Sequence, residues 1–173
     1  MRDARSLYGE KVAANQKHDA TPAFIALHRA NVPFTPHSYV HDPRAESFGM
    51  EAAEALGVEP ARVFKTLMAE VDGELCVGVV PVMGSLDLKA LADALGGKRA
   101  QMADAAKAQR ATGYIIGGIS PLGQKRRHRT AIDKSSANWS TIFVSGGRRG
   151  LEAELQPQDL VQLTNAVIAR LAR

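Results

Sequence analysis

The spacing of apolar residues along the chain alternates between the period of a helix and the two-residue period of a strand. Helical spacing predicts helices over residues 22–30, 50–56, 88–95, 104–113 and 157–171. Short apolar and β-branched runs predict strands over 34–40, 64–71, 75–82, 114–116, 129–132, 141–145 and 151–155. Short strands with helices between them and at both ends predict an α+β domain with a curved mixed or barrel-like sheet flanked by helices.

Residues that favour the ends of elements support several of these boundaries. Thr21 followed by Pro22 is a typical helix start, because threonine caps the first turn and proline fits the first helical position. Asp72-Gly73 between two apolar runs predicts a β-hairpin. Pro36 confines the first predicted strand to a sheet edge or a bulge, since proline has no backbone N–H to donate.

Length and composition favour one globular domain. The chain has 173 residues, of which 45% are hydrophobic and 23% charged, close to the average of globular proteins. No apolar run approaches the roughly 18 residues of a membrane helix, and the first residues lack the apolar core of a secretory signal. We therefore expect a cytoplasmic protein, with a polar extension over residues 1–20 and a single domain over 21–173.

Charge is distributed unevenly. Residues 1–86 carry 8 Lys/Arg and 11 Asp/Glu, whereas residues 87–173 carry 14 and 7. Between Lys89 and Arg149 there are 12 basic and 3 acidic residues. Such a segment is typical of a surface that binds a polyanion, and a solvated basic face is the alternative.

Two features could carry chemistry. Lys65 lies inside an apolar strand, where its ammonium either reaches solvent along the sheet or contacts a phosphate, a carboxylate or a developing oxyanion. Gly117 and Gly118 follow the predicted strand 114–116, and paired glycines let the backbone approach a ligand or form a tight turn.

Basic residues follow two glycine turns. Lys125, Arg126 and Arg127 come directly after the glycine run, and Arg148 and Arg149 follow a second glycine pair. Cations beside a pocket mouth would suit a substrate attached to a phosphate chain, and an exposed basic loop is the alternative.

Several kinds of site are absent from the sequence. No Gly-x-Ser-x-Gly elbow or phosphate-binding Gly-xxxx-Gly-Lys-Ser/Thr loop occurs, and Cys76 lies in an apolar strand, as a buried structural thiol would. His37 and His41 would lie on one face, as metal ligands need to, only if the segment between them were a helix. Pro36 favours an extended chain there instead. We expect no metal, no cofactor and no protein nucleophile.

Taken together, the motifs resemble the YbaK-type Cys-tRNA(Pro) deacylases, which are related to the editing domain of bacterial prolyl-tRNA synthetases. The resemblance extends over residues 21–173. The motifs that carry it include His37-x-Tyr39-x-His41-Asp42-Pro43, Phe48-Gly49, Val63-Phe64-Lys65-Thr66-Leu67, the run 112–125 and Val144-Ser-Gly-Gly-Arg-Arg-Gly-Leu.

This resemblance implies the removal of a wrongly attached amino acid from tRNA. Lys65 matches the essential lysine of the family, and Gly117 and Gly118 match its substrate-contacting glycine loop. The residues that match its pocket are Tyr39, Phe48, Thr66 and Ser145. In this family the thiol of the cysteinyl substrate is implicated in attacking its own ester.

The resemblance also implies partners and leaves alternatives. Mischarged Cys-tRNA(Pro) is the expected substrate, prolyl-tRNA synthetase is a candidate partner, and no membrane contact is expected. The alternatives are a deacylase for Ala-tRNA(Pro) or a broader range, and a non-catalytic regulator that binds tRNA or a synthetase. Lys65 together with Gly117 and Gly118 argues against the regulator, and the run 112–125 favours the cysteine branch.

Overall fold

The computed structural model describes residues 20–173, so almost all of the predicted extension over 1–20 lies outside the described residues. Within the described part the chain forms five α-helices and two short 3-10 helices. The α-helices are α2 (Pro22–Arg29), α3 (Phe48–Leu56), α4 (Leu88–Ala94), α5 (Ala105–Thr112) and α6 (Pro157–Thr164). The 3-10 helices are η1 (Pro60–Arg62) and η2 (Lys134–Asn138). None of these helices is long and apolar enough to cross a bilayer.

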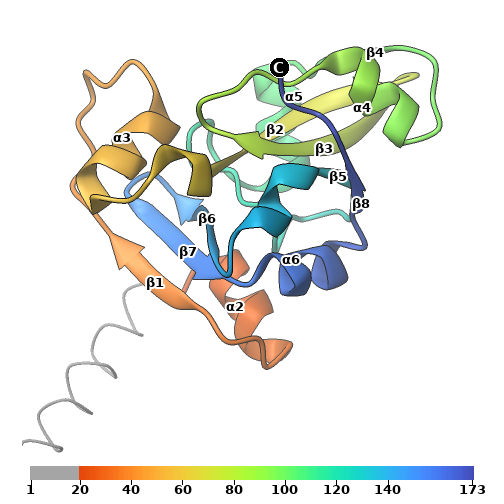
Figure 1. The fold of residues 1–173 in the computed structure, drawn as a ribbon. Helices are drawn as coiled ribbons and strands as arrows, with labels where there is room; N and C mark the ends of the chain where they lie inside the picture. The colour runs from red at the N-terminus through yellow and green to blue at the C-terminus, as the bar shows by residue number, and fades with distance from the viewer. Residues whose placement is uncertain (1–19) are drawn as a thin grey trace, which may run out of the picture.

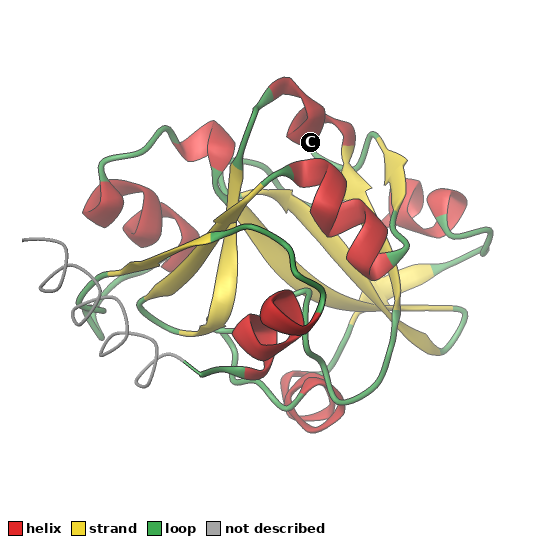
Figure 2. Ribbon diagram, turned by 90° about the horizontal axis from the view of Figure 1, so that it is seen from below, coloured by secondary structure: helices red, strands yellow, loops and turns green. Residues whose placement is uncertain are grey.

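The strands form two sheets, with the helices on the outside (Figure 2). The smaller sheet has the order β1-β7-β6 and the larger one the order β4-β2-β3-β5-β8. The strands are β1 (Thr35–Ser38), β2 (Phe64–Val71), β3 (Glu74–Pro81), β4 (Ala100–Met102), β5 (Arg129–Asp133), β6 (Ile142–Arg148), β7 (Leu151–Leu155) and β8 (Val167–Ala169). The predicted α+β class is confirmed, but the described strands form two open sheets and no closed barrel.

The two sheets meet at the start of β2. A parallel bridge pairs Val63 with Phe143 of β6, so one end of β2 borders the smaller sheet (Figure 1). At its other end β2 pairs with β4, but only through Ala69–Val71. Residues 64–67 therefore pair with β3 on one side and border the site described below on the other.

Local signals correctly predicted three features of the fold. The Thr21 side chain accepts a hydrogen bond from Phe24 N at the start of α2. Asp72 and Gly73 form the turn of the β2–β3 hairpin with φ values of 50° and 87°. β1, which contains Pro36, lies at a sheet edge. Each of these features depends on residues that are adjacent in the sequence, so it can be predicted from the sequence.

The predicted helix over 157–171 is wrong in its second half. Helix α6 ends at Thr164, and Asn165 adopts a left-handed conformation with φ 52°. The next residues form β8, which pairs in parallel with β5. The carboxylate of Asp133 then accepts hydrogen bonds from the backbone N–H groups of Leu171 (2.7 Å) and Ala172 (2.9 Å). Pairing with a strand distant in sequence overrides the local helical spacing.

The predicted strand over 114–116 is also wrong. The Tyr114 side chain is buried, and its hydroxyl donates a hydrogen bond to Leu122 O (2.6 Å). Ile115 accepts a hydrogen bond from Gly118 N (2.9 Å), which closes a turn. The segment thus folds on itself as a loop, and the glycines after it supply the turn.

Strand β2 is covered on both faces, as its continuous apolar run predicted. Phe64 and Met68 pack into the main core cluster between the sheets. Ala69 and Val71 pack into a second cluster that contains residues of α4. This double burial holds β2 rigidly, so the strand is a firm support for side chains at its open edge.

Candidate active site

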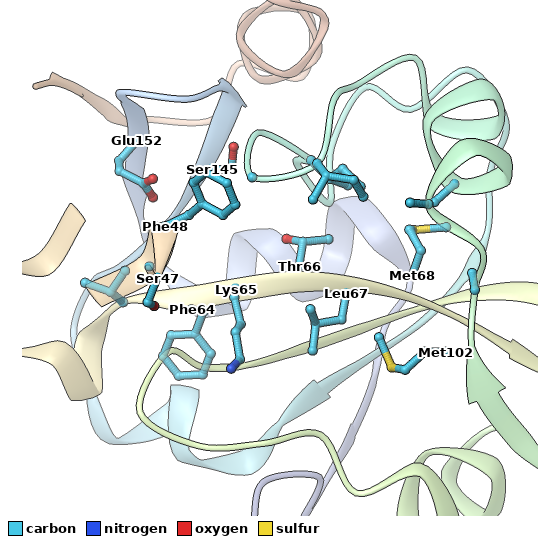
Figure 3. A pocket seen from close by; sticks show the side chains of 18 of the residues that line it. Ser47, Phe48, Phe64, Lys65, Thr66, Leu67, Met68, Met102, Ser145 and Glu152 are labelled. Atoms are coloured by element: carbon cyan, nitrogen blue, oxygen red, sulfur yellow. The ribbon is translucent and has the colours of Figure 1, made fainter. Parts of the chain in front are cut away.

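A cavity of about 410 Å³ lies along the open edge of β2 (Figure 3). Helix α3 and the turn before it border one end and α5 borders the other, while the loop after α5 reaches back to Phe48 through Gly117. The lining residues are Glu46, Ser47, Phe48, Gly49, the run 63–68, Met102, Ala103, Ala105, Ala108, Ile116, Gly117, Ile119, Ser145 and Glu152. These residues come from six separate parts of the chain, so the cavity exists only in the folded domain.

Most of the predicted catalytic and substrate-binding residues meet in this cavity. Lys65, Thr66, Phe48, Gly117 and Ser145 all line it. The predicted residues that do not line it are Tyr39, Gly118, Lys125, Arg126, Arg127, Arg148 and Arg149. The structure therefore separates a compact group around β2 from residues at the rim or farther away.

Lys65 lies at the cavity without a hydrogen bond or ion pair to any described residue. Partial burial lowers the pKa of its ammonium. Figure 3 shows Lys65 and Leu67 on one side of β2 and Thr66 on the other. A ligand that touches both Lys65 and Thr66 must therefore cross the open edge of the strand.

Thr66 offers three polar groups at that edge. Its Oγ1 is buried and has no hydrogen-bond partner among the described residues. The backbone of Val63 accepts from Val82 N of the adjacent chain segment, and Met68 O accepts from Ala103 N on the opposite side. Because pairing alternates along an antiparallel strand, the N–H and C=O of Thr66 also face away from β3. An unpaired buried hydroxyl is costly, and a ligand would satisfy it.

The two glycines of the predicted loop have different surroundings. Gly117 has φ 87° and lies against Phe48, and a Cβ there would be 2.8 Å from the ring. Gly118 packs on the neighbouring turn, where a Cβ would lie 2.8 Å from Arg148 Cα. The Gly118 N–H already donates to Ile115 O. The Gly118 amide is therefore not free for a substrate oxyanion, and only Gly117 borders the cavity.

Sequence reasoning missed Glu152. This side chain is 8% exposed, and burial raises its pKa to about 8. It is paired across the strands with Ser145, and both line the same end of the cavity as Phe48 (Figure 3). No described residue forms a hydrogen bond or ion pair with its carboxyl group. Leucine, glutamate and alanine alternate in β7, a pattern typical of a strand whose glutamates face solvent, so the sequence alone does not reveal that Glu152 is buried.

Residues 37–41 approach this end of the cavity from β1. Tyr39 is not a lining residue, but burial and the nearby charge of Glu152 raise its pKa to about 12. His37 contacts Glu154 (2.7 Å) and His41 contacts Glu51 (2.8 Å). The two histidines are held by different carboxylates, and no group of three potential metal ligands occurs within residues 20–173.

The predicted tRNA-contacting cations form two groups. Arg149 lies at the rim, where its guanidinium carbon is 4.8 Å from the centre of the Phe48 ring. Arg148 is exposed beside it. The other three, Lys125, Arg126 and Arg127, are exposed on the loop before β5. Arg126 and Arg127 border a separate shallow depression beside α6.

The described residues supply no cysteine nucleophile at the cavity. Cys76 is fully buried in β3, and burial raises the pKa of its thiol to about 11. This confirms the predicted burial of the thiol. The cavity instead combines one ammonium, one free hydroxyl, a glycine backbone and a buried carboxyl group. Such a set can bind and polarise an ester that is already activated.

Comparison with known proteins gives consistent matches. The family described as "Aminoacyl-tRNA editing domain" matches residues 43–163, a range that contains every residue lining the cavity. The chain is 34% identical over 165 residues to the "Putative Cys-tRNA(Pro)/Cys-tRNA(Cys) deacylase EbsC" of Enterococcus faecalis, covering 92% of this chain and 98% of that protein. It is 29% identical over 115 residues to the "Uncharacterized protein YwhH" of Bacillus subtilis, covering 66% and 73%. Its fold is similar to that in the "Crystal structure of a putative trans-editing enzyme for prolyl tRNA synthetase", with a TM-score of 0.76 and 22% identity, covering 88% and 95%.

Proposed function

Because the chain belongs to the family of aminoacyl-tRNA editing domains, we propose that it hydrolyses mischarged Cys-tRNA(Pro) in trans. The family membership confirms the resemblance to YbaK-type deacylases that the sequence motifs indicated. The choice of cysteine follows the run 112–125 and the Cys-tRNA substrates in the name of the Enterococcus relative. The catalytic unit is the domain over 21–173, acting in the cytoplasm with the translation machinery.

The observation that carries this proposal is the open edge of β2. Lys65 and the unpartnered hydroxyl of Thr66 lie on its two sides, and no cysteine thiol of the described chain reaches the cavity. An aminoacyl ester needs orientation and charge stabilisation more than it needs a strong protein nucleophile. The arrangement therefore suits a substrate that brings its own reactive group.

In the proposed reaction the thiolate of the cysteinyl group attacks its own carbonyl carbon. A sulfur–carbon bond forms, the carbon–oxygen bond to the terminal ribose breaks, and the proton that the thiol has lost passes to the departing ribose oxygen, which becomes a hydroxyl. The products are free tRNA and a cyclic cysteine thiolactone, which water then opens to cysteine. The Lys65 ammonium stabilises the negative charge on the carbonyl oxygen, and Thr66 and Gly117 orient the ester.

Glu152 gives the pocket a group for the α-ammonium of the aminoacyl substrate. In the empty cavity burial keeps its carboxyl group largely protonated near neutral pH. An entering ammonium stabilises the carboxylate, so the proton leaves as the ion pair forms. Ser145, paired with Glu152 across the strands, lines the same end of the site, and Tyr39 lies close enough to Glu152 to feel its charge.

The partners of this reaction are a mischarged tRNA and, as a docking partner, prolyl-tRNA synthetase. Arg148, beside the cavity rim, and Lys125, Arg126 and Arg127, on the loop before β5, are the candidate contacts for the tRNA phosphates. A regulator that only binds tRNA would not require an unpaired hydroxyl and an ammonium at one strand edge.

Single-turnover hydrolysis of cysteinyl-, seryl-, alanyl- and prolyl-tRNA tests the proposal. We expect the cysteinyl ester to react more than about 200-fold faster than the seryl ester, beyond the discrimination that near-isosteres reach by binding. Lys65→Ala should lower this rate by about 10²–10³. Lys89→Ala, which removes an exposed lysine on α4, is the matched control.

Three results would contradict the proposal in whole or in part. Equal rates for the seryl and cysteinyl esters would exclude the substrate thiol as nucleophile. Fastest hydrolysis of alanyl-tRNA would assign the chain to the alanine branch. If the folded Lys65→Ala variant keeps its rate, the lysine is structural.

A further inference from the structure

The backbone of Ile116 is held from two directions by side chains of other elements. Its N–H donates a hydrogen bond to Oε1 of Gln109 on α5 (2.9 Å). Its carbonyl oxygen accepts two hydrogen bonds from Arg149, from Nε (2.9 Å) and Nη2 (2.7 Å). We call these three residues the Ile116 clamp. The clamp joins α5 to the turn between β6 and β7 through the residue that precedes Gly117.

Packing alone does not fix this part of the loop. The side chains of Ile115 and Ile116 are 51% and 37% exposed, and Gly117 has φ 87°. Exposed loop backbone next to a glycine has few contacts that oppose local opening. The polar contacts of the clamp therefore supply much of the restraint on the position of Gly117.

Arg149 is also coupled to the cavity through Phe48. Its guanidinium lies over the Phe48 ring, and the same ring contacts Gly117. A guanidinium is planar and donates two parallel hydrogen bonds while it stacks on an aromatic ring, which a lysine ammonium does not do. The side chain is therefore engaged by the fold itself, unlike a cation held ready for a phosphate.

We propose that Gln109 and Arg149 are positioning residues, which hold Gly117 in the conformation that hydrolysis requires. Arg149 then serves the glycine loop through its geometry, in place of the tRNA phosphate contact that its charge suggested. This inference rests on the proposed deacylase function. A displacement of about 1 Å in a positioning group lowers a rate by up to about 10²-fold, so losing the clamp reduces turnover without abolishing tRNA binding.

Four variants separate geometry from charge. Gln109→Leu removes the hydrogen-bond acceptor at similar volume, whereas Gln109→Glu keeps it. Arg149→Ala removes the guanidinium, whereas Arg149→Lys keeps the charge but loses the paired donors. Arg110→Ala is the control, because it removes an exposed cation from the same helix as Gln109.

The readouts are the maximal single-turnover rate, the tRNA concentration at half-saturation, the salt dependence of tRNA binding and the amide exchange of Ile116. We expect Gln109→Leu, Arg149→Ala and Arg149→Lys to lower the maximal rate by about 10- to 100-fold. Half-saturation and the salt dependence should change little. Gln109→Glu should retain the rate, and Ile116 amide exchange should accelerate in Gln109→Leu but not in Gln109→Glu.

Different outcomes would contradict the proposed role of the Ile116 clamp and the proposed deacylase function. Absence of turnover by the wild-type chain on every aminoacyl-tRNA overturns the proposed function, and the clamp's role with it. Wild-type turnover together with normal maximal rates in Gln109→Leu and Arg149→Lys overturns the clamp alone. Arg149 is a phosphate contact if Arg149→Lys keeps the rate that Arg149→Ala loses and if only Arg149→Ala reduces the salt dependence of tRNA binding. If an Arg149 variant does not fold, the comparison of Gln109→Leu with Gln109→Glu tests the role of the clamp.

Discussion

Glu152 makes the folding stability of this domain depend on pH in a specific direction. The raised pKa means that the folded domain binds the carboxyl proton more tightly than the unfolded chain does. Ionisation of Glu152 therefore opposes folding, and its cost grows as the pH rises from the ordinary value of 4.5 toward about 8. Glu152→Gln removes the titrating group while keeping its size.

The magnitude follows from the two pKa values. Each unit of pKa difference corresponds to about 1.4 kcal/mol. At pH values between the two pKa values, the free energy of unfolding of the wild-type domain falls by close to that amount per pH unit. Between pH 5.5 and 7.5 the free energy of unfolding of the wild type should fall by about 2–3 kcal/mol relative to that of Glu152→Gln. The other ionisable groups are present in both proteins, so their contributions cancel in the difference.

Urea denaturation at pH 5.5, 6.5 and 7.5 measures this difference directly. Glu54→Gln makes the same chemical change at an exposed position of α3 and serves as the control. The test compares how stability changes with pH and not the stability of Glu152→Gln at one pH, because burying an amide has a cost of its own that does not depend on pH. Parallel pH profiles for wild type and Glu152→Gln would refute the conclusion that a buried carboxyl group titrates near neutrality.

Three further predictions concern the rest of the molecule. Replacing Lys125, Arg126 and Arg127 with glutamine should reduce the salt slope of tRNA binding by roughly 0.7–0.9 log units per lost phosphate contact; unchanged affinity at every salt concentration would make the loop a solvated surface. Gly118→Ala should lower the free energy of unfolding by about 1–3 kcal/mol in urea titrations, because its Cβ would meet backbone atoms at 2.8 Å, and unchanged stability would show that the turn adapts. Cys76→Ala should leave single-turnover rates unchanged, and an inactive but folded variant would place this thiol in the mechanism.

The sequence predicted those parts of the fold that short segments determine. The cap at Thr21 and the Asp72-Gly73 turn depend on neighbouring residues, and the structure contains both. The strand over 167–169 escaped prediction because its hydrogen bonds come from β5, more than thirty residues earlier in the chain. The same residues fit a helical period, so the period alone could not distinguish the two structures.

The site was predictable to the extent that its residues break a local pattern. Lys65 stands out as a cation in an apolar strand, and the structure places it at the cavity. Glu152 follows the ordinary alternation of a strand, so nothing in the sequence distinguishes it from an exposed carboxylate. The contact between Arg149 and Ile116 joins residues 33 positions apart and has no sequence signature at all.

The unpaired stretch of β2 has a consequence for the behaviour of the protein in solution. An open strand edge is ordinarily a template on which other chains add strands and aggregate. Here the turn and helix around Phe48 and the segment from Met102 to Ala108 enclose the edge, so a ligand the size of an aminoacyl group fits where a whole strand does not. Lysine is also a residue that natural sheets use to discourage strand addition. Lys65 thus also opposes strand addition in the free protein, at the place where we propose that it meets the substrate.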